Sequence, residues 1–317
     1  MQKFKKICPK CKGNNTKKDW KRRWKQSYKC KSCNHIRINK ARNSKSKLMK
    51  KLYYQYVVRK QTYAELSQDY WLSTKTLQTW FDKINIQSSQ DLPIWKEIVL
   101  LIDTTYFGKF WLMLFKDAYS KKVLYHQIVD YETNKAYKEW IQYLINHWVK
   151  IKAIVSDWRR WLLGGFGKIP TQMCHFHQKA IIRRYITKKP KLQANIELKE
   201  IVDWLHKTDK ESFTIRLDKR YNKHKDWINE RWINKDWKKY YKHRRTRSAY
   251  LSLRRNLQYL FIYQDYYWIL DIPNTTNWLE TVFWYIKTRL RCHSWLRLDR
   301  QLKFVTFLIN QPHTFYN

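Results

Sequence analysis

The sequence predicts a mixed α/β protein, in which a sheet-and-helix core follows two small N-terminal domains and is interrupted by a helical insertion. Three observations predict it: paired cysteines near the N-terminus, short apolar runs that end at aspartates, and a later basic stretch with helical periodicity. The chain has 317 residues, of which 44% are hydrophobic. This is enough for roughly two domains with appendages and excludes an intrinsically disordered protein.

The charge of the chain indicates a polyanionic partner. Lys and Arg number 66 against 25 Asp and Glu, a formal net charge of +41. Residues 1–60 and 178–255 are the two strongly basic blocks. An AT-rich genome would also enrich Lys, but the codons of Glu are A-rich too, and Glu is scarce. We therefore expect a nucleic acid, because so much like charge repels itself unless phosphates offset it.

The sequence shows no sign of a membrane span or a secretory signal. The longest clean apolar run is residues 98–102, far short of the roughly 20 residues that a membrane span needs. The first 30 residues are basic and polar. We expect a soluble, cytoplasmic protein.

Two Cys-x2-Cys pairs in the first basic block predict a zinc ribbon over residues 1–45. Two such pairs 18 residues apart can hold one structural Zn²⁺ tetrahedrally through four thiolates, and the stretch between them, about residues 20–28, would form the strands. The four ligands are Cys8, Cys11, Cys30 and Cys33. A disulfide pair is disfavoured inside the cell, and a thioredoxin-like redox site lacks a βαβ pattern. The ribbon would clamp DNA or serve dimerisation.

Residues 46–90 predict a helix-turn-helix domain. Thr62 and Glu65 form a capping box that opens one helix, and Ser73 is the expected N-cap of a second, with a turn around residues 70–72. A generic three-helix bundle is the alternative interpretation. The candidate DNA contacts of the ribbon and of the recognition helix are Arg22, Arg23, Thr74, Lys75, Gln78 and Thr79.

Residues 91–190 predict the first part of the core. Strands are expected at 98–102, 110–115, 123–129 and 151–156, with a helix over 134–149 before the last of them. Three meandering strands, a helix, and a strand that lies parallel beside the first are the start of an RNase H-like α/β fold. Its C-terminal helices are expected over residues 266–317.

Two of these strands end at carboxylates, Asp103 and Asp157. The carboxyl ends of strands are the usual place for a site in such sheets, although Asp is also common after strands because it favours turns. A third acid, Glu280, lies in an aromatic helical segment, and Lys287 follows two turns later on the same face. An ordinary exposed Glu paired with basic neighbours is the alternative for Glu280.

These residue types suit two-metal chemistry on phosphodiesters. Two Mg²⁺ (or Mn²⁺) ions need several hard oxygen ligands to activate a water or a 3′-hydroxyl and to stabilise the leaving oxygen. Asp103, Asp157 and Glu280 would supply those ligands. Lys287 would hold a phosphate nearby.

A short motif, Cys174 and His177, follows a further strand expected at residues 171–173 and opens a basic helix that contains Arg183 and Arg184, two further candidate DNA contacts. A zinc site completed by Cys292 or His293 is one interpretation, and a structural or DNA-positioning role is the other. Residues 191–265 predict an all-α insertion rich in Trp, Lys and Arg. Its tryptophans would pack in a core or stack on unpaired bases.

Taken together, the ordered set of motifs resembles bacterial insertion-sequence transposases of the mutator-like DDE group, over nearly the whole chain. The resemblance implies an RNase H-like catalytic core with an all-α insertion, Mg²⁺-dependent cleavage at transposon ends, and strand transfer into target DNA, usually within a dimer. By position it implies Asp103, Asp157 and Glu280 as the catalytic triad, with Cys174 and His177 as an accessory motif.

We therefore expect a DDE transposase that binds double-stranded DNA, both terminal inverted repeats and target, as a homodimer. Two alternatives remain open at this stage. One is a non-catalytic zinc-ribbon DNA-binding regulator, and the other is an RNase H-like nuclease that cuts branched DNA without joining it.

Overall fold

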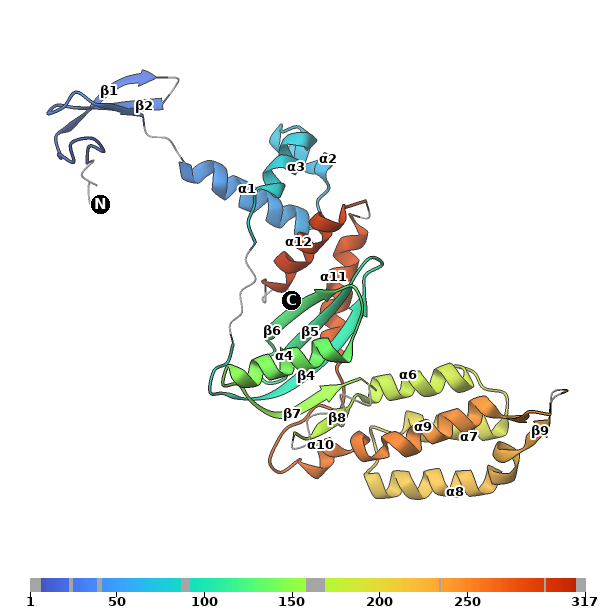
Figure 1. Ribbon diagram of the computed structural model, residues 1–317. Helices are drawn as coiled ribbons and strands as arrows, with labels where there is room; N and C mark the ends of the chain where they lie inside the picture. The colour runs from blue at the N-terminus through green and yellow to red at the C-terminus, as the bar shows by residue number, and fades with distance from the viewer. Residues whose placement is uncertain are drawn as a thin grey trace. The chain divides into compact units, whose positions relative to one another are not determined.

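The computed structural model divides the chain into two compact units, residues 1–85 and 86–317, and each is described by itself (Figure 1). The described residues are 7–22, 25–38, 42–86, 92–157, 169–233, 235, 237–293 and 295–311.

The first unit begins with a three-stranded antiparallel sheet in the order β1-β2-β3. Its strands are β1 (Thr16–Arg22), β2 (Lys25–Cys30) and β3 (Ile36–Ile38). The predicted strands between the cysteine pairs are present and extend further than expected on both sides. A sheet this small buries few side chains, so its stability must come from elsewhere in the segment.

Three short helices complete the first unit: α1 (Arg42–Val57), α2 (Tyr63–Tyr70) and α3 (Thr74–Asp82). The predicted capping box is confirmed, because Glu65 N donates to Thr62 Oγ1 and Thr62 N donates to Glu65. Ser73 caps α3 as predicted. An aromatic cluster centred on Phe81, within 6 Å of three tyrosine rings, packs the helices together.

The second unit is built on a five-stranded mixed sheet in the order β6-β5-β4-β7-β8, which confirms the mixed α/β class. Its strands are β4 (Glu97–Tyr106), β5 (Trp111–Asp117), β6 (Val123–Val129), β7 (Lys150–Ser156) and β8 (Thr171–Met173). The first three form an antiparallel meander, and β7 and β8 then pair in parallel beside β4.

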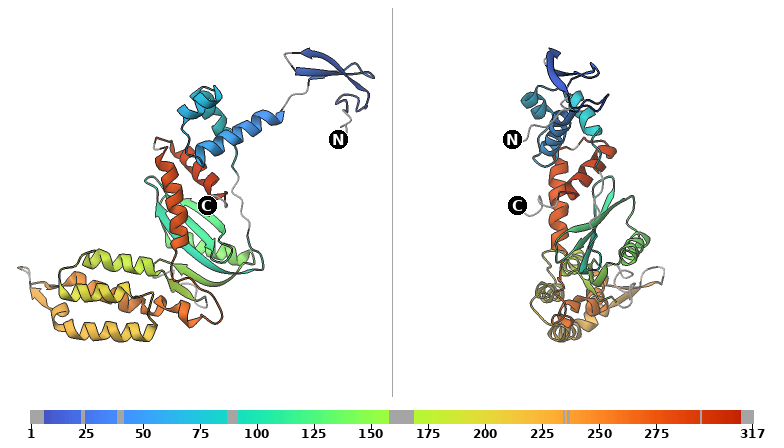
Figure 2. Two further views of the ribbon diagram at one scale, coloured as in Figure 1. Left: turned by 180° about the vertical axis from the view of Figure 1, so that it is seen from behind. Right: turned by 90° about the vertical axis from the view of Figure 1, so that its left-hand side faces the viewer.

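The alternation of side chains along β4 determines what faces each side of the sheet. Ile98, Leu100 and Ile102 pack with α4 (Asn134–Asn146), which covers one face. The residues between them therefore point to the opposite face, where α11 (Asn277–Arg291) lies (Figure 2). The helix predicted over 134–149 ends at Asn146, since Trp148 adopts a left-handed conformation with φ of 61° before β7 begins.

The inserted segment has its own apolar core, centred on residues such as Phe213, Leu253 and Phe261. Its helices are α6 (His175–Ile186), α7 (Gln193–Asp203), α8 (Lys210–Asn229), α9 (Arg244–Leu260) and α10 (Ile262–Asp265). After it, α11 packs against α12 (Leu298–Ile309). Within the described part of the chain, no helix combines the length and the apolar character needed to cross a bilayer.

The prediction of an all-α insertion is wrong in one place, because α8 and α9 are joined by a two-stranded hairpin. Its strands are β9 (Arg231–Ile233) and β10 (Lys239–Tyr241). Trp232 lies opposite Tyr240, and the ion pair of Glu230 with Lys242, 2.8 Å long, closes the base of the hairpin. Aromatic cross-strand pairs stabilise such ribbons, which a helical pattern drawn from the surrounding residues does not predict.

The chain returns from the insertion to the sheet through a buried polar clamp. Gln172, fully buried on β8, donates to the carbonyl of Leu260 over 2.9 Å and accepts from the backbone N–H of Tyr263 over 3.0 Å. His175 Nε2 donates to the same carbonyl over 2.6 Å. The clamp satisfies backbone groups exposed by the break between α9 and α10, as burial requires.

Replacing Gln172 by Met keeps the side-chain volume and removes the clamp. We expect the Gln172→Met variant to lose about 1–3 kcal/mol of unfolding free energy, because the N–H of Tyr263 is left without its acceptor. Urea denaturation would show a lower midpoint at an unchanged slope. The control is Gln258→Met on the exposed side of α9. Equal midpoints for both variants and the wild type would contradict the clamp.

Candidate metal centres

The four N-terminal cysteines lie in two knuckles of matching geometry. In the first, the N–H of Cys8 donates to the carbonyl of Gly13, and Lys12, which follows Cys11, has a φ of 55°. In the second, the N–H of Cys30 donates to the carbonyl of His35, and Asn34, which follows Cys33, also has a φ of 55°. Two like turns therefore present four thiols to one point.

The thiols fit a tetrahedral metal. The Sγ atoms of Cys8 and Cys33 are 3.6 Å apart, and those of Cys11 and Cys30 are 3.5 Å apart. Zinc–sulfur bonds of about 2.3 Å in a tetrahedron place sulfurs about 3.8 Å apart. All four sulfurs lie within 4.8 Å of one another. Backbone hydrogen bonds from Cys33 and Ser32 lower the pKa of Cys30 to about 6, whereas burial and the neighbouring thiols raise the pKa of Cys33. The cluster therefore favours a thiolate at Cys30 first.

The DNA contacts expected in the first unit are described only in part. Thr74, Lys75 and Thr79 are exposed on α3, and Gln78 is half-buried. Arg23 and the side chain of Arg22 lie outside the described residues.

In the second unit, the sheet brings two carboxylate-bearing strands together. In the parallel pairing of β4 with β7, Leu101 lies opposite Val155. Asp103 and Asp157 each stand two residues further along. Because parallel strands run in step, these two aspartates are neighbours. The expectation that the first strand ends at Asp103 is wrong, since β4 continues to Tyr106 by pairing with β5, and only Asp157 directly follows its strand.

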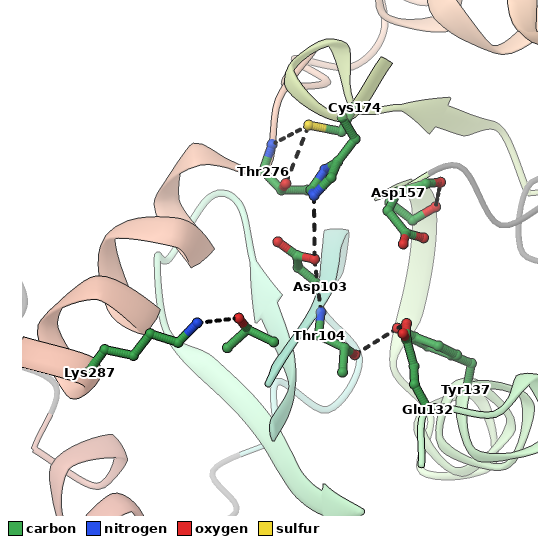
Figure 3. Close-up of polar contacts among 11 residues, drawn as sticks. Asp103, Thr104, Glu132, Tyr137, Asp157, Cys174, Thr276 and Lys287 are labelled. Atoms are coloured by element: carbon green, nitrogen blue, oxygen red, sulfur yellow. Dashed lines mark hydrogen bonds and ion pairs between the residues drawn. The ribbon is translucent and has the colours of Figure 1, made fainter. Parts of the chain in front are cut away.

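Helix α11 adds Glu280 and Lys287 from the face of the sheet toward which Asp103 points. Strand alternation places Asp103 and Thr105 on the same face. Lys287 Nζ donates to Thr105 Oγ1 over 2.6 Å. Glu280, seven residues earlier and therefore on the same side of the helix, lies beside Asp103. The spacing that the sequence predicted thus places Glu280 and Lys287 two turns apart on the side of α11 that faces β4, and Figure 3 shows the contact of Lys287 with this strand.

The tightest group of side chains at this edge consists of Asp103, His177 and Glu280. One potential ligand atom from each lies within 4.8 Å of the others. His177 Nε2 is 3.9 Å from Asp103 Oδ1. Asp157 is not a member of this group, although its charge acts on Asp103. His177 therefore takes a more central place than the accessory role that the sequence suggested.

The pKa values of the three side chains in the group are shifted from their ordinary values. Burial raises the pKa of Asp103 to about 7, since the opposing effect of His177 is partly cancelled by the neighbouring carboxylates. Burial alone would lower the pKa of His177, but Cys174 and Asp103 raise it to about 9. Burial also raises the pKa of Glu280. At neutral pH the imidazolium thus supplies positive charge where carboxylates converge.

A second layer of contacts lies on the α4 side of β4, and the sequence patterns did not reveal it. The hydroxyl of Tyr137 donates to Glu132 over 2.5 Å and accepts from Thr104 Oγ1 at 2.7 Å. The backbone N–H of Thr104 in turn donates to Asp103 Oδ1 over 2.8 Å. The chain of contacts orients the Asp103 carboxylate (Figure 3). An acid just before a helix is too common to be recognised from sequence alone.

Cys174 is fully buried and contacts the start of α11. Its Sγ accepts from Thr276 N at 3.3 Å and from Thr276 Oγ1 at 3.4 Å. The zinc site considered for Cys174 and His177 with Cys292 or His293 is not formed among the described residues. Cys292 is exposed and donates to the carbonyl of Thr288, and His293 packs on Phe304.

The donor set at the sheet edge fits a divalent cation. Asp103 and Glu280, whose pKa values are raised by burial, offer hard oxygen ligands of the kind that Mg²⁺ and Mn²⁺ prefer. The imidazole of His177 adds a nitrogen donor, which Mn²⁺ accepts more readily than Mg²⁺. The buried Asp103 is the residue that gains most from a bound cation.

Comparison with known proteins adds no family. The sequence matches no protein-family model and no curated protein. The function is therefore inferred from the residues themselves.

Removing zinc should unfold the N-terminal ribbon alone. Metal binding supplies most of the folding free energy of so small a sheet, so chelation should abolish the hydrogen-exchange protection of residues 7–38 and leave that of residues 92–157 unchanged. Cys30→Ser should have the same effect without a chelator, whereas the control Cys292→Ser should retain one zinc per chain. Full protection of residues 7–38 in excess chelator would argue against a structural metal.

Asp103→Asn should stabilise the metal-free protein above pH 7. The pKa of Asp103 is raised to about 7 in the folded state, against about 3.9 unfolded, so wild-type stability falls as pH rises from about 4 through 7. The unfolding free energy of Asp103→Asn should exceed that of the wild type by almost nothing near pH 4 and by up to about 4 kcal/mol at pH 8. Urea denaturation in EDTA measures it.

The control for this measurement is Asp226→Asn, an exposed acid on α8. Adding Mg²⁺ or Mn²⁺ should stabilise the wild type and not Asp103→Asn, because only the ionised carboxylate binds the metal. Parallel pH profiles for the wild type and Asp103→Asn would show that burial of this carboxylate has no energetic cost.

Proposed function

We propose that this protein is the transposase of an insertion sequence, with an RNase H-like catalytic core that cleaves DNA at the element's ends and joins them to target DNA. The observation that carries the proposal is the convergence of Asp103, His177 and Glu280 from three distant segments. The strand order, an antiparallel meander whose first strand pairs in parallel with a later one, also supports it.

In this proposal Asp103, Asp157 and Glu280 hold two Mg²⁺ or Mn²⁺ ions. When bound, the ions would supply Lewis-acid activation of a water or a 3′-hydroxyl and stabilise the leaving oxygen. Neighbouring residues of the chain orient these ligands. Thr104 orients the Asp103 carboxylate through its backbone N–H, and Tyr137 fixes Thr104 from the other face of the sheet.

Lys287 is the proposed phosphate contact of the site. Its ammonium is tethered to Thr105 and lies 5.3 Å from the centre of the Phe107 ring. Burial lowers its pKa, and so does the nearby Arg291, so a phosphate would restore a favourable environment for its charge. His177 already presents positive charge to Asp103, which lessens the repulsion between the carboxylates before a metal binds.

The remaining parts of the proposal concern DNA. The zinc ribbon and the α3 face of Thr74, Lys75 and Thr79 would recognise terminal inverted repeats, and a homodimer would bring two ends together. The net charge of +41 supports a nucleic-acid partner.

The test uses the whole protein with labelled duplex carrying the gene's flanking ends, a target plasmid, and Mg²⁺ or EDTA. We expect metal-dependent cleavage and joining in the wild type. Glu280→Gln should lower both by at least about a thousandfold, since a lost metal ligand removes several kcal/mol of transition-state stabilisation. The matched control is Glu139→Gln, an exposed acid paired with Lys135.

The other outcomes separate the alternatives. Tight DNA binding without cleavage in either metal condition would contradict the proposal and favour a non-catalytic regulator. Cleavage of branched DNA without joined products would favour a nuclease. Equal activity of Glu280→Gln and Glu139→Gln would remove Glu280 from the site.

A further inference from the structure

Helices α6 and α9 of the inserted segment pack against each other (Figure 1). A hollow of about 740 Å³ lies between them. Four arginines line it: Arg184 from α6 and Arg244, Arg245 and Arg255 from α9. Among the described residues that line it there is no acid. So much positive charge around one hollow favours an anionic ligand.

A second hollow continues this surface. It measures about 490 Å³, shares Arg244 and Arg245 with the first, and extends to Lys189 and Lys191 in the connection between α6 and α7. We name the combined surface the α6–α9 groove. It is defined by Arg184, Lys189, Lys191, Arg244, Arg245 and Arg255.

The arginines of the groove differ from several other cations of the insertion, which form ion pairs with acids. Buried Glu197 pairs with Arg220 at 2.5 Å and Lys223 at 2.7 Å. Similar ion pairs join Asp218 to Arg254 and Asp203 to Arg183. Within the part of the chain that the structure describes, no such ion pair involves Arg184, Arg244 or Arg255.

Arg183 and Arg184, both predicted from the sequence as DNA contacts, therefore have different surroundings. Arg183 lies 3.5 Å from Asp203, outside the groove. Arg184, the next residue on the helix, is exposed and lines the groove. Arg245 has a structural role as well, because it donates to the carbonyl of Arg184 over 2.6 Å and so joins α9 to α6.

The groove matches the spacing of a nucleic-acid backbone. Arg244 and Arg255 are eleven residues apart on one helix, which corresponds to about 16 Å. Phosphates on one strand of a duplex follow one another every 3.4 Å of axis, so the distance from Arg244 to Arg255 spans about five phosphates. Arginine donates two parallel hydrogen bonds to a phosphate. Within the groove, buried Asn256 of α9 donates to Gln178 of α6 over 2.8 Å and so joins the two helices.

The same groove is unsuited to unpaired bases. Its aromatic lining residues among those described are Tyr185, which is partly buried, and His243, whose ring already stacks on Trp227. The hollow between α7 and α8 offers a more exposed ring, Trp204, but Arg216 already stacks on that ring. Backbone contact without stacking is characteristic of duplex binding.

We propose that the α6–α9 groove binds the phosphodiester backbone of duplex DNA, with Arg184, Arg244 and Arg255 as its phosphate contacts. This inference rests on the proposed function and deepens it, because it assigns DNA holding in the insertion to one surface. Contacts of this kind carry no sequence preference.

The test compares two triple variants of the full chain. Arg184, Arg244 and Arg255 are changed to Ala in the first, and Arg183, Arg216 and Lys225 in the second, so each loses three exposed cations from the insertion. Binding of a 30-base-pair duplex of arbitrary sequence is measured by fluorescence anisotropy across salt concentrations. The slope of log affinity against log salt should fall by about 3 in the first variant, at about 0.9 for each lost contact.

The second variant should keep the wild-type slope, and the loss in the first should be the same for duplexes of different sequence. Equal slopes in both variants, a loss confined to single-stranded oligonucleotide, or no duplex binding by the wild type would each overturn the proposal. Metal-dependent cleavage is assayed in parallel. If the wild type cleaves DNA and the two triple variants have equal salt slopes, only the groove proposal is rejected. If the first variant has a reduced salt slope but the wild type does not cleave DNA, the proposed function is rejected and the groove proposal stands.

Discussion

The buried thiol of Cys174 is the contact on which the geometry of the carboxylate site depends. Its backbone N–H donates to Ser156 at the end of β7, and its sulfur accepts twice from Thr276 at the start of α11. Glu280 lies one turn after Thr276, and His177 lies one turn after Cys174. Sulfur is a weak acceptor, so these bonds persist because water is excluded from them. One small side chain thus relates two distant helices to the sheet.

A second constraint is electrostatic, because a sheet edge that buries carboxylates must supply positive charge nearby. Asp103 is only 6% exposed, and its like-charged neighbours make ionisation harder still. His177 on one side and Lys287 on the other offset part of this cost. The remaining cost is what a bound cation would remove. Binding of a divalent cation would therefore relieve the same electrostatic cost that destabilises the metal-free site.

Local signals in the sequence were sufficient for most of the elements and insufficient for the contacts between them. The capping box of Thr62 and the apolar run ending at Asp103 each depend on a few adjacent residues, so pattern and propensity predicted them. The contact of His177 with Asp103 and the layer built on Tyr137 depend on how α6 and α4 pack, which no short pattern encodes. The β9–β10 hairpin was missed for a similar reason, since cross-strand pairs such as Trp232 with Tyr240 decide it.

The order of the segments along the chain also has a temporal consequence. Asp103, Asp157 and His177 all precede most of the insertion, whereas Glu280 follows it by sequence. A ribosome adding about 5–20 residues each second needs roughly 5–20 s to translate the hundred or so residues between His177 and Glu280. During that interval the nascent polypeptide holds an incomplete set of ligands. Completion of the group is therefore tied to late translation, after the basic α6–α9 surface has emerged.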